Sequence, residues 1–404
     1  MKRFSWLRVV PVTQRLAVMA FLILGMVFAR AWAGDNVWTS IGPAGTWVGG
    51  LVVDPQNPST VYVGLCNNFP SCESGGTFKT TDGGASWNRL TGLPVPSSPL
   101  AIDPQKPSTI YAAGHPYVWK SVDGGASWNA IWNFGNLISN WLTAFVIDPR
   151  NPSTLYAATQ QFDECTGEIL HKSVDGGRSW VDFTFESLGA AAQCVLDMVI
   201  DLQNPATLYA AFQRTGVFKS IDGGASWTAA NSGLTANDNH LSSSLAIDPQ
   251  NPSTLYTVAA RGSVPGRTSW GVFKSNDGGA NWNLASSGLP EWPANSNCCY
   301  RPRLVVDPQS PNRVYLGAAD EGRVHRVFMS ADGGATWLDS GFAMPSQSLW
   351  FGGLAVGSQG AAGTVYAGTP RQGVFAITFP PLGRRELLRQ IRSRRPATQP
   401  LLGP

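Results

Sequence analysis

After its first 33 residues, this 404-residue sequence has almost no amphipathic helical patterning. Its apolar segments are short, and many of its 44 glycines and 29 prolines lie between them. Glycine and proline interrupt regular elements and favour turns. The sequence therefore predicts an all-β chain of short strands rather than a helical bundle.

The central part of the chain also has little positive charge. Residues 1–33 carry five of the 29 basic residues and residues 384–404 carry six, which leaves 18 basic and 25 acidic residues between them. Binding to nucleic acid depends on clustered positive charge that neutralises phosphates. A body with a formal net charge of −7 is therefore not expected to have a nucleic-acid partner.

Metal-ligand spacing is absent as well. No two cysteines are separated by the two residues typical of zinc sites, and the four histidines are scattered, so we expect no metal and no cofactor. An even number of cysteines in an exported chain favours disulfides. Cys66 with Cys72, Cys165 with Cys194, and the neighbours Cys298 and Cys299 are the pairs that their positions suggest.

The N-terminus has the features of a secretory signal peptide. A basic start precedes the apolar run 16–29, and Ala31-Trp32-Ala33 places small residues at the two positions that a signal peptidase reads. We expect residues 1–33 to be removed and the protein to be secreted or periplasmic, with no membrane span left. An uncleaved anchor is the alternative, although the apolar run is short for a bilayer.

One motif occurs six times and dominates the rest of the chain. It reads Ser/Thr-x-Asp-Gly-Gly-x-polar-Trp, and its aspartates are 41 to 55 residues apart: Asp82, Asp123, Asp175, Asp222, Asp277 and Asp332. Before each copy stand an apolar segment ending in Asp-Pro (Asp201-Leu202 in one unit) and a segment containing tyrosine. Four short strands per unit at this period are typical of a β-propeller blade.

A seventh unit follows the sixth motif. Residues 353–356, 364–368 and 373–377 match three strands, and the fourth is missing. The segment Val37–Ile41 has no unit of its own and would complete this blade, which leaves no sheet edge bare. We predict one propeller over residues 34–383 with seven four-stranded blades, six or eight being the alternatives, in a monomeric protein. The basic tail, 384–404, is predicted to be disordered, with a short amphipathic helix as the alternative.

The six motif aspartates are predicted to hold turns rather than to catalyse. An aspartate before Gly-Gly can accept hydrogen bonds from its own turn, the glycines supply positive φ, and the tryptophan packs between blades. The repeat resembles the Asp-box (BNR) proteins, which include sialidases, xyloglucan hydrolases, sortilin-type receptors and photosystem II assembly factors. That resemblance implies the architecture but leaves the function open.

The ligand is expected on the face opposite these turns, where loops such as 159–169, 261–271 and 285–303 differ in length. Aromatic side chains there suit sugar rings or peptide segments, and the candidates are Trp47, Trp141, Trp270, Trp292, Tyr300 and Trp350. We therefore expect an exported binding or scaffolding module with a glycan or protein ligand.

A glycoside hydrolase is the alternative. Residues 38–42 and 48–51 resemble the first blade of the xyloglucan hydrolases, and Glu73 before Gly75-Gly76 stands where that family has a catalytic aspartate. Glycoside hydrolysis needs a second carboxylate; Asp320 or Glu321 would have to supply it, because this chain lacks the family's second propeller. The early Arg-Ile-Pro signature of sialidases is absent.

Overall fold

The computed structural model describes most of the chain after residue 36. The described residues are 37–43, 47–67, 74–93, 98–114, 116–134, 140–161, 169–184, 195–212, 215–234, 244–264, 267–290, 292–293, 302–319, 324–345, 351–359, 362–369 and 372–379. None of these segments forms a helix that is long and apolar enough to cross a membrane. The described residues do not include Glu73, Asp320, Glu321, Tyr300, Trp350 or five of the six cysteines.

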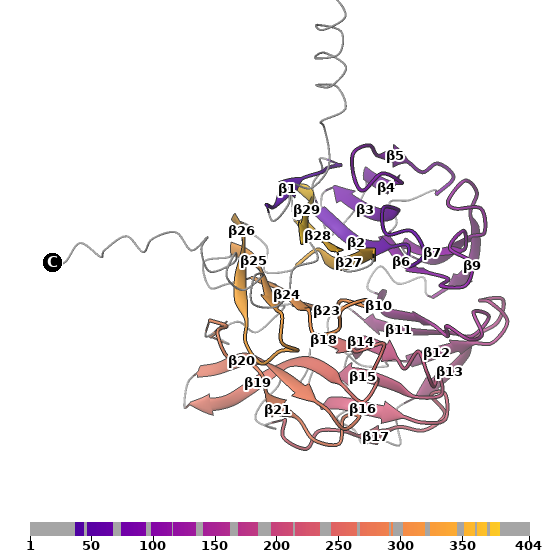
Figure 1. Cartoon of the computed structure of the whole chain (residues 1–404). Helices are drawn as coiled ribbons and strands as arrows, with labels where there is room; N and C mark the ends of the chain where they lie inside the picture. Colours follow the sequence, from indigo (N-terminus) through magenta and orange to yellow (C-terminus); the bar gives the residue numbers. More distant parts are fainter. Residues whose placement is uncertain are drawn as a thin grey trace, which may run out of the picture.

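The protein is a seven-bladed β-propeller of antiparallel sheets arranged around a central axis (Figure 1). Blade 1 contains β2 (Trp47–Val53), β3 (Val61–Asn67), β4 (Ser74–Thr80) and β5 (Asn88–Arg89). Blade 2 contains β6 (Ser98–Ile102), β7 (Ile110–Gly114), β8 (Tyr117–Ser121) and β9 (Asn129–Asn133). Blade 3 contains β10 (Asn140–Ile147), β11 (Leu155–Gln161), β12 (Ile169–Ser173) and β13 (Val181–Thr184).

The next three blades repeat this order. Blade 4 contains β14 (Val195–Ile200), β15 (Leu208–Phe212), β16 (Gly216–Ser220) and β17 (Thr228–Ala229). Blade 5 contains β18 (Ser244–Ile247), β19 (Leu255–Val264), β20 (Arg267–Ser275) and β21 (Asn283–Leu284), with β22 (Trp292–Pro293) added beside β20. Blade 6 contains β23 (Arg303–Val306), β24 (Val314–Ala319), β25 (Val324–Ser330) and β26 (Leu338–Pro345).

Blade 7 closes the ring by joining the two ends of the propeller. Its strands are β27 (Gly353–Gln359), β28 (Ala362–Thr369), β29 (Gly373–Phe379) and, from the start of the chain, β1 (Thr39–Ser40). Thr39 pairs with Ala376 and Ser40 with Phe375, and the indigo β1 lies beside the yellow β29 in Figure 1. The prediction of seven blades closed by the N-terminal strand is confirmed.

The predicted loop at 261–271 is wrong. In the structure β19 and β20 extend through this segment as one long hairpin, with Val264 paired to Arg267. Glycine and proline in this segment are typical of irregular backbone, but the residues on either side of its tip pair across the two strands. This hairpin is therefore longer than those of the other blades. The extension provides the edge with which β22 pairs.

In blades 1 to 5 the repeated lysine connects its blade to the next one, and in blades 1, 4 and 5 the repeated tyrosine donates to the same carbonyl. In blade 5, for example, Tyr256 Oη and Lys274 Nζ both donate to the carbonyl of Gly333 in blade 6, at 3.0 and 2.8 Å. Five such lysines sit 5.2 to 5.4 Å from the centre of a tyrosine ring, a separation at which a cation and an aromatic face attract each other. The apolar core lies between the blades, where the tyrosine rings are buried.

Candidate functional site

The two kinds of repeated turn lie on one face of the propeller, which we name the turn face. In blade 1 the amide of Gly83, in the Asp-Gly-Gly turn, donates to the carbonyl of Ser59, next to the Asp-Pro turn, at 2.9 Å. The same bond recurs in blades 2 to 6. The second-to-third-strand connections and the links between blades therefore emerge on the opposite face, the loop face.

Each Asp-Gly-Gly turn is held by its own aspartate. In blade 4 the carboxylate of Asp222 accepts hydrogen bonds from the amide and hydroxyl of Ser226 at 2.9 and 2.5 Å and from the hydroxyl of Ser220 at 2.8 Å. These bonds lower the pKa of Asp222 to about 2. A carboxylate occupied in this way is poorly suited to acid–base catalysis at neutral pH.

Two of the predicted loop-face aromatics have described side chains. Trp47 is half-buried at the start of β2, opposite Cys66, and Trp270 is half-buried in β20 against the core between blades 5 and 6. Trp292 is the cross-strand partner of Trp270, whereas Trp47 stands on blade 1. The structure thus brings Trp270 and Trp292 together, and of Trp141 it describes only the backbone, in β10.

Cys66 is buried at the end of β3 and is disulfide-bonded. The other five cysteines lie outside the described residues, as does Glu73 with both candidates for the second carboxylate, Asp320 and Glu321. The hydrolase geometry therefore stays a prediction. Among the residues that the structure describes, no group of three or more His, Cys, Asp or Glu could hold a metal ion.

A polar cluster that the sequence did not reveal lies on the inner strands. In every blade one inner-strand residue pairs with the position two after the repeated tyrosine. In chain order these residues are Gly50, Ser98, Ala144, Asp197, Ser244, Arg303 and Gly353. Most are small, but blades 4, 5 and 6 supply a carboxylate, a hydroxyl and a guanidinium in succession. We call Asp197, Ser244 and Arg303 the polar arc.

Hydrogen bonds connect the polar arc across three blades. Asp197 Oδ2 accepts from the amide of Leu245 at 2.9 Å and from Ser244 Oγ at 3.2 Å, and Oδ1 accepts from the amide of Met198 at 2.9 Å. The amide of Leu304, next to Arg303, donates to Ser244 Oγ at 3.2 Å. These residues lie toward the loop-face ends of β14, β18 and β23, beside the central axis.

Burial raises the pKa of the Asp197 carboxyl, and the nearby Arg303 guanidinium opposes that rise. A β-bulge between Val195 and Asp197 displaces the strand at this point, a device that proteins use to re-aim a side chain. Since backbone N–H groups already donate to the Asp197 carboxylate, its role is to hold the inner strands of blades 4 and 5 together. Arg303 is only partly buried, and its guanidinium has five N–H donors suited to carbonyl or carboxylate groups of a ligand.

A hydroxyl–imidazole–carboxylate chain in blade 3 has the geometry of a catalytic group, but its imidazole is buried and only its carboxylate, on Asp182, is exposed. His171 Nδ1 lies 2.7 Å from Asp182 Oδ1, and Nε2 lies 2.9 Å from Thr159 Oγ1. The imidazole is buried, with the edge of Trp132 at 4.5 Å between ring centres. We therefore assign His171 to the contact between blades 2 and 3, with Asp182 and Thr159 as the hydrogen-bond partners that hold its ring in place.

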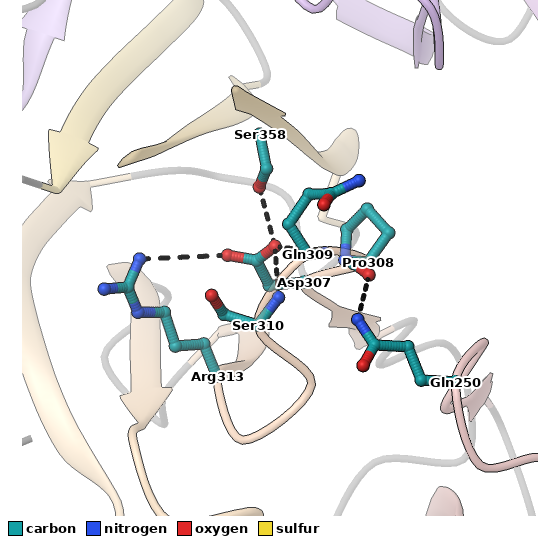
Figure 2. Close-up of polar contacts among 7 residues, drawn as sticks. All are labelled: Gln250, Asp307, Pro308, Gln309, Ser310, Arg313 and Ser358. Carbon is teal, nitrogen blue, oxygen red and sulfur yellow. Dashed lines mark hydrogen bonds and ion pairs between the residues drawn. The ribbon is translucent and has the colours of Figure 1, made fainter. Parts of the chain in front are cut away.

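A second polar cluster, on the turn face, joins blades 6 and 7 (Figure 2). Asp307 is buried and accepts from the hydroxyl of Ser358 at 2.6 Å, while Arg313 Nη1 lies 3.9 Å from its other oxygen. Arg313 occupies the place of a threonine in the five preceding blades, and Gln250 of blade 5 donates to the carbonyl of Pro308 at 2.9 Å. The cluster stabilises the junction where blade 7 has no Asp-Gly-Gly motif of its own.

Comparisons with known proteins give the same architecture. No family model matches the chain. A probable oligoxyloglucan-reducing end-specific xyloglucanase of Neosartorya fischeri is 32% identical over 71 residues, which are 18% of this chain and 8% of that protein. Such a short match does not establish a family.

Three solved structures are similar in fold. An ancestral GH74 enzyme has a TM-score of 0.63 at 22% identity over 84% of this chain and 46% of its own. YCF48 from Cyanidioschyzon merolae has a TM-score of 0.55 at 16% identity, over 85% of this chain and 98% of its own. A YCF48 structure bound to a D1 peptide has a TM-score of 0.52 at 14% identity, over 87% and 96%. The chain thus spans about half of the GH74 enzyme and nearly all of YCF48.

Proposed function

We propose that this protein is an exported Asp-box propeller that binds or scaffolds another molecule through its loop face. Of the ligands that the sequence allows, a peptide segment of another protein is favoured over a glycan. The observation that carries the proposal is the polar arc, which places a guanidinium and a fixed carboxylate beside the axis on this face. Hydrogen-bonding groups on a rigid scaffold can recognise a ligand without reordering.

The comparisons support this choice without deciding it. Nearly the whole length of YCF48 is matched, and one of its structures is bound to a peptide. The signal peptide over 1–33, secretion or export to the periplasm, the disulfides and a monomeric state belong to the same proposal. Release of residues 1–33 would be seen directly in the mass of the exported protein.

A peptide-binding measurement tests the proposal. A displayed peptide library is selected on the immobilised protein, and the selected peptides are measured by calorimetry against two variants. Arg303→Gln should weaken binding, because it removes the guanidinium, the positive charge of the polar arc. Arg326→Gln should not, because Arg326 lies on β25, the third strand of the same blade, and forms an exposed ion pair with Asp339 of β26. Equal affinity for the wild type and both variants would reject the polar arc as the site.

The alternative is a carbohydrate-active hydrolase, favoured by the 71-residue match to a xyloglucanase. It is tested by measuring reducing ends released from xyloglucan, β-glucans and sialylated glycans. Release that disappears in Glu73→Gln would make the protein a glycoside hydrolase, with Asp320 or Glu321 as candidates for the second carboxylate. No release at high protein concentration would leave the binding function.

A further inference from the structure

The repeats provide an internal comparison for the turn face. Blades 1 to 6 build the same two turns. At an exposed position of these turns, a residue that one blade accepts should therefore be acceptable in the other blades as well. Departures at such positions are therefore not required by the fold. They concentrate on blades 2, 3 and 4.

The first set of departures is apolar. The residue before the aspartate of the Asp-Gly-Gly turn is Thr81 in blade 1 and Asn276 in blade 5, both exposed. In blades 2, 3 and 4 it is Val122, Val174 and Ile221, whose side chains are 51%, 64% and 70% exposed. Leu202, which replaces the proline of the Asp-Pro turn in blade 4, is 44% exposed. Exposed apolar side chains that gather on one part of a surface often mark an interaction site, whereas single scattered ones do not.

The second set of departures is basic. Lys106 stands where four blades have asparagine, Arg150 where five have glutamine, and Arg178 where five have alanine. All three side chains are exposed. They add three positive charges to blades 2 and 3 and none to the other blades.

The two sets belong to one surface, which we name the blade 2–4 patch and define by these seven residues. Gln105, beside Lys106, donates to the carbonyl of Arg150 at 3.2 Å. Lys120 of blade 2 donates to the carbonyl of Gly176, two residues after Val174, at 3.2 Å. Lys172 does the same to Gly223, two residues after Ile221, at 2.7 Å. After burial, which contributes most, the like charges of Arg178 and Lys106 lower the pKa of Lys120.

We propose that the blade 2–4 patch is a docking surface for a protein partner that presents carboxylates beside aliphatic side chains. The added cations supply charge complementarity for such a partner, and the turn backbones are held in place by the bonds above. The turn aspartates of these blades are the reason for choosing a protein rather than an anionic membrane. Asp123, Asp175 and Asp222 adjoin the apolar residues, so negative and positive groups alternate on this surface. A folded partner can place its carboxylates against the cations and away from these aspartates, whereas an anionic membrane presents phosphates to both.

Two multiple variants test the patch, and both use residues that this chain already tolerates at equivalent positions. The apolar variant combines Val122→Thr, Val174→Thr and Ile221→Asn. The charge variant combines Lys106→Asn, Arg150→Gln and Arg178→Ala. A control at the same turn position, Thr81→Asn with Asn276→Thr, exchanges polar residues on blades 1 and 5 and leaves the patch unchanged. Thermal unfolding first verifies that all of them are folded.

The probe is a displayed library of random 15-residue peptides, selected on the full protein with no counter-selection on either patch variant. We expect enrichment of sequences that combine Asp or Glu with Leu, Ile or Val. Their affinity should fall about tenfold or more in each patch variant, stay unchanged in the control, and weaken as salt is raised.

Three results would overturn the proposal. Selected peptides that bind the wild type and both patch variants equally would show that the patch is not used. Binding of phosphatidylglycerol vesicles that is lost in the charge variant would make it a membrane surface. Concentration-dependent dimerisation that is lost in the apolar variant would make it a contact between copies of this chain.

Discussion

Replacing Lys172 with methionine should measure what one inter-blade connection contributes to stability. Lys172 Nζ donates to the carbonyl of Gly223 in the next blade at 2.7 Å and lies 5.2 Å from the centre of the Tyr156 ring. A hydrogen bond to a charged group is worth about 1.5–3 kcal/mol and an exposed cation–π contact about 0.5–1 kcal/mol. Methionine preserves the packing of the apolar stem of Lys172. The variant also avoids the cost of desolvating an ammonium group, which offsets part of the lost interactions.

The expected net loss is therefore about 1–3 kcal/mol in the free energy of unfolding. The propeller runs from Thr39 to Phe379. At an unfolding entropy of about 2.1 cal/mol/K per residue, each kcal/mol lowers the Tm of a domain this long by about 1.4 °C, so a fall of roughly 1–4 °C is expected by circular dichroism. The urea midpoint should shift in the same direction.

The chain supplies its own control for this experiment. Blade 6 has Met329, which is buried, at the lysine position, and blade 7 has no Asp-Gly-Gly motif to offer a carbonyl. Met329→Lys should therefore destabilise the protein, because it buries a charge without the acceptor that the other lysines have. The reasoning is refuted if Lys172→Met leaves Tm unchanged, or if Met329→Lys stabilises the protein as a simple consensus of the repeats would suggest.

Two further predictions use the same scaffold. Tyr256→Phe should lower Tm because it removes the 3.0 Å bond from Tyr256 Oη to Gly333, a loss of about 1 kcal/mol. Tyr315→Phe should cost nothing, because among the described residues the buried Tyr315 hydroxyl has no hydrogen-bond partner; equal losses in the two variants would contradict this account. Burial lowers the pKa of His171, and Asp182 only partly opposes the shift. The unfolded chain therefore binds more protons than the folded chain below about pH 6.5, and stability should fall as pH falls through this range. His171→Gln should flatten the dependence of Tm on pH between 7 and 5, and identical slopes for the two proteins would show that this histidine is not responsible.

Much of the fold could be predicted from the sequence because its determinants are local. An aspartate, two glycines and a hydroxyl within eight residues form a complete hydrogen-bonded turn, as at Asp222, so each copy of the motif signals one blade wherever it occurs. The unmatched segment before the first repeat and the missing strand of the last one complement each other, and their pairing followed from that alone.

Register and position across blades were beyond the reach of the sequence. The long hairpin of β19 and β20 depends on cross-strand partners, which turn residues within the hairpin do not specify. Asp307 has the same local motif as five other turn residues, yet it is almost completely buried because blade 7 packs against it.

The sequence by itself determined the repeating unit, the number of blades and the way the ring closes. Only the tertiary structure decided which side chains stand together on the two faces. Asp197, Ser244 and Arg303 are separated by 47 and then 59 residues and share no motif. A bulge shifts Asp197 within its strand. They form a cluster because inner strands of successive blades lie side by side around the axis, and no pattern within a single blade encodes that proximity.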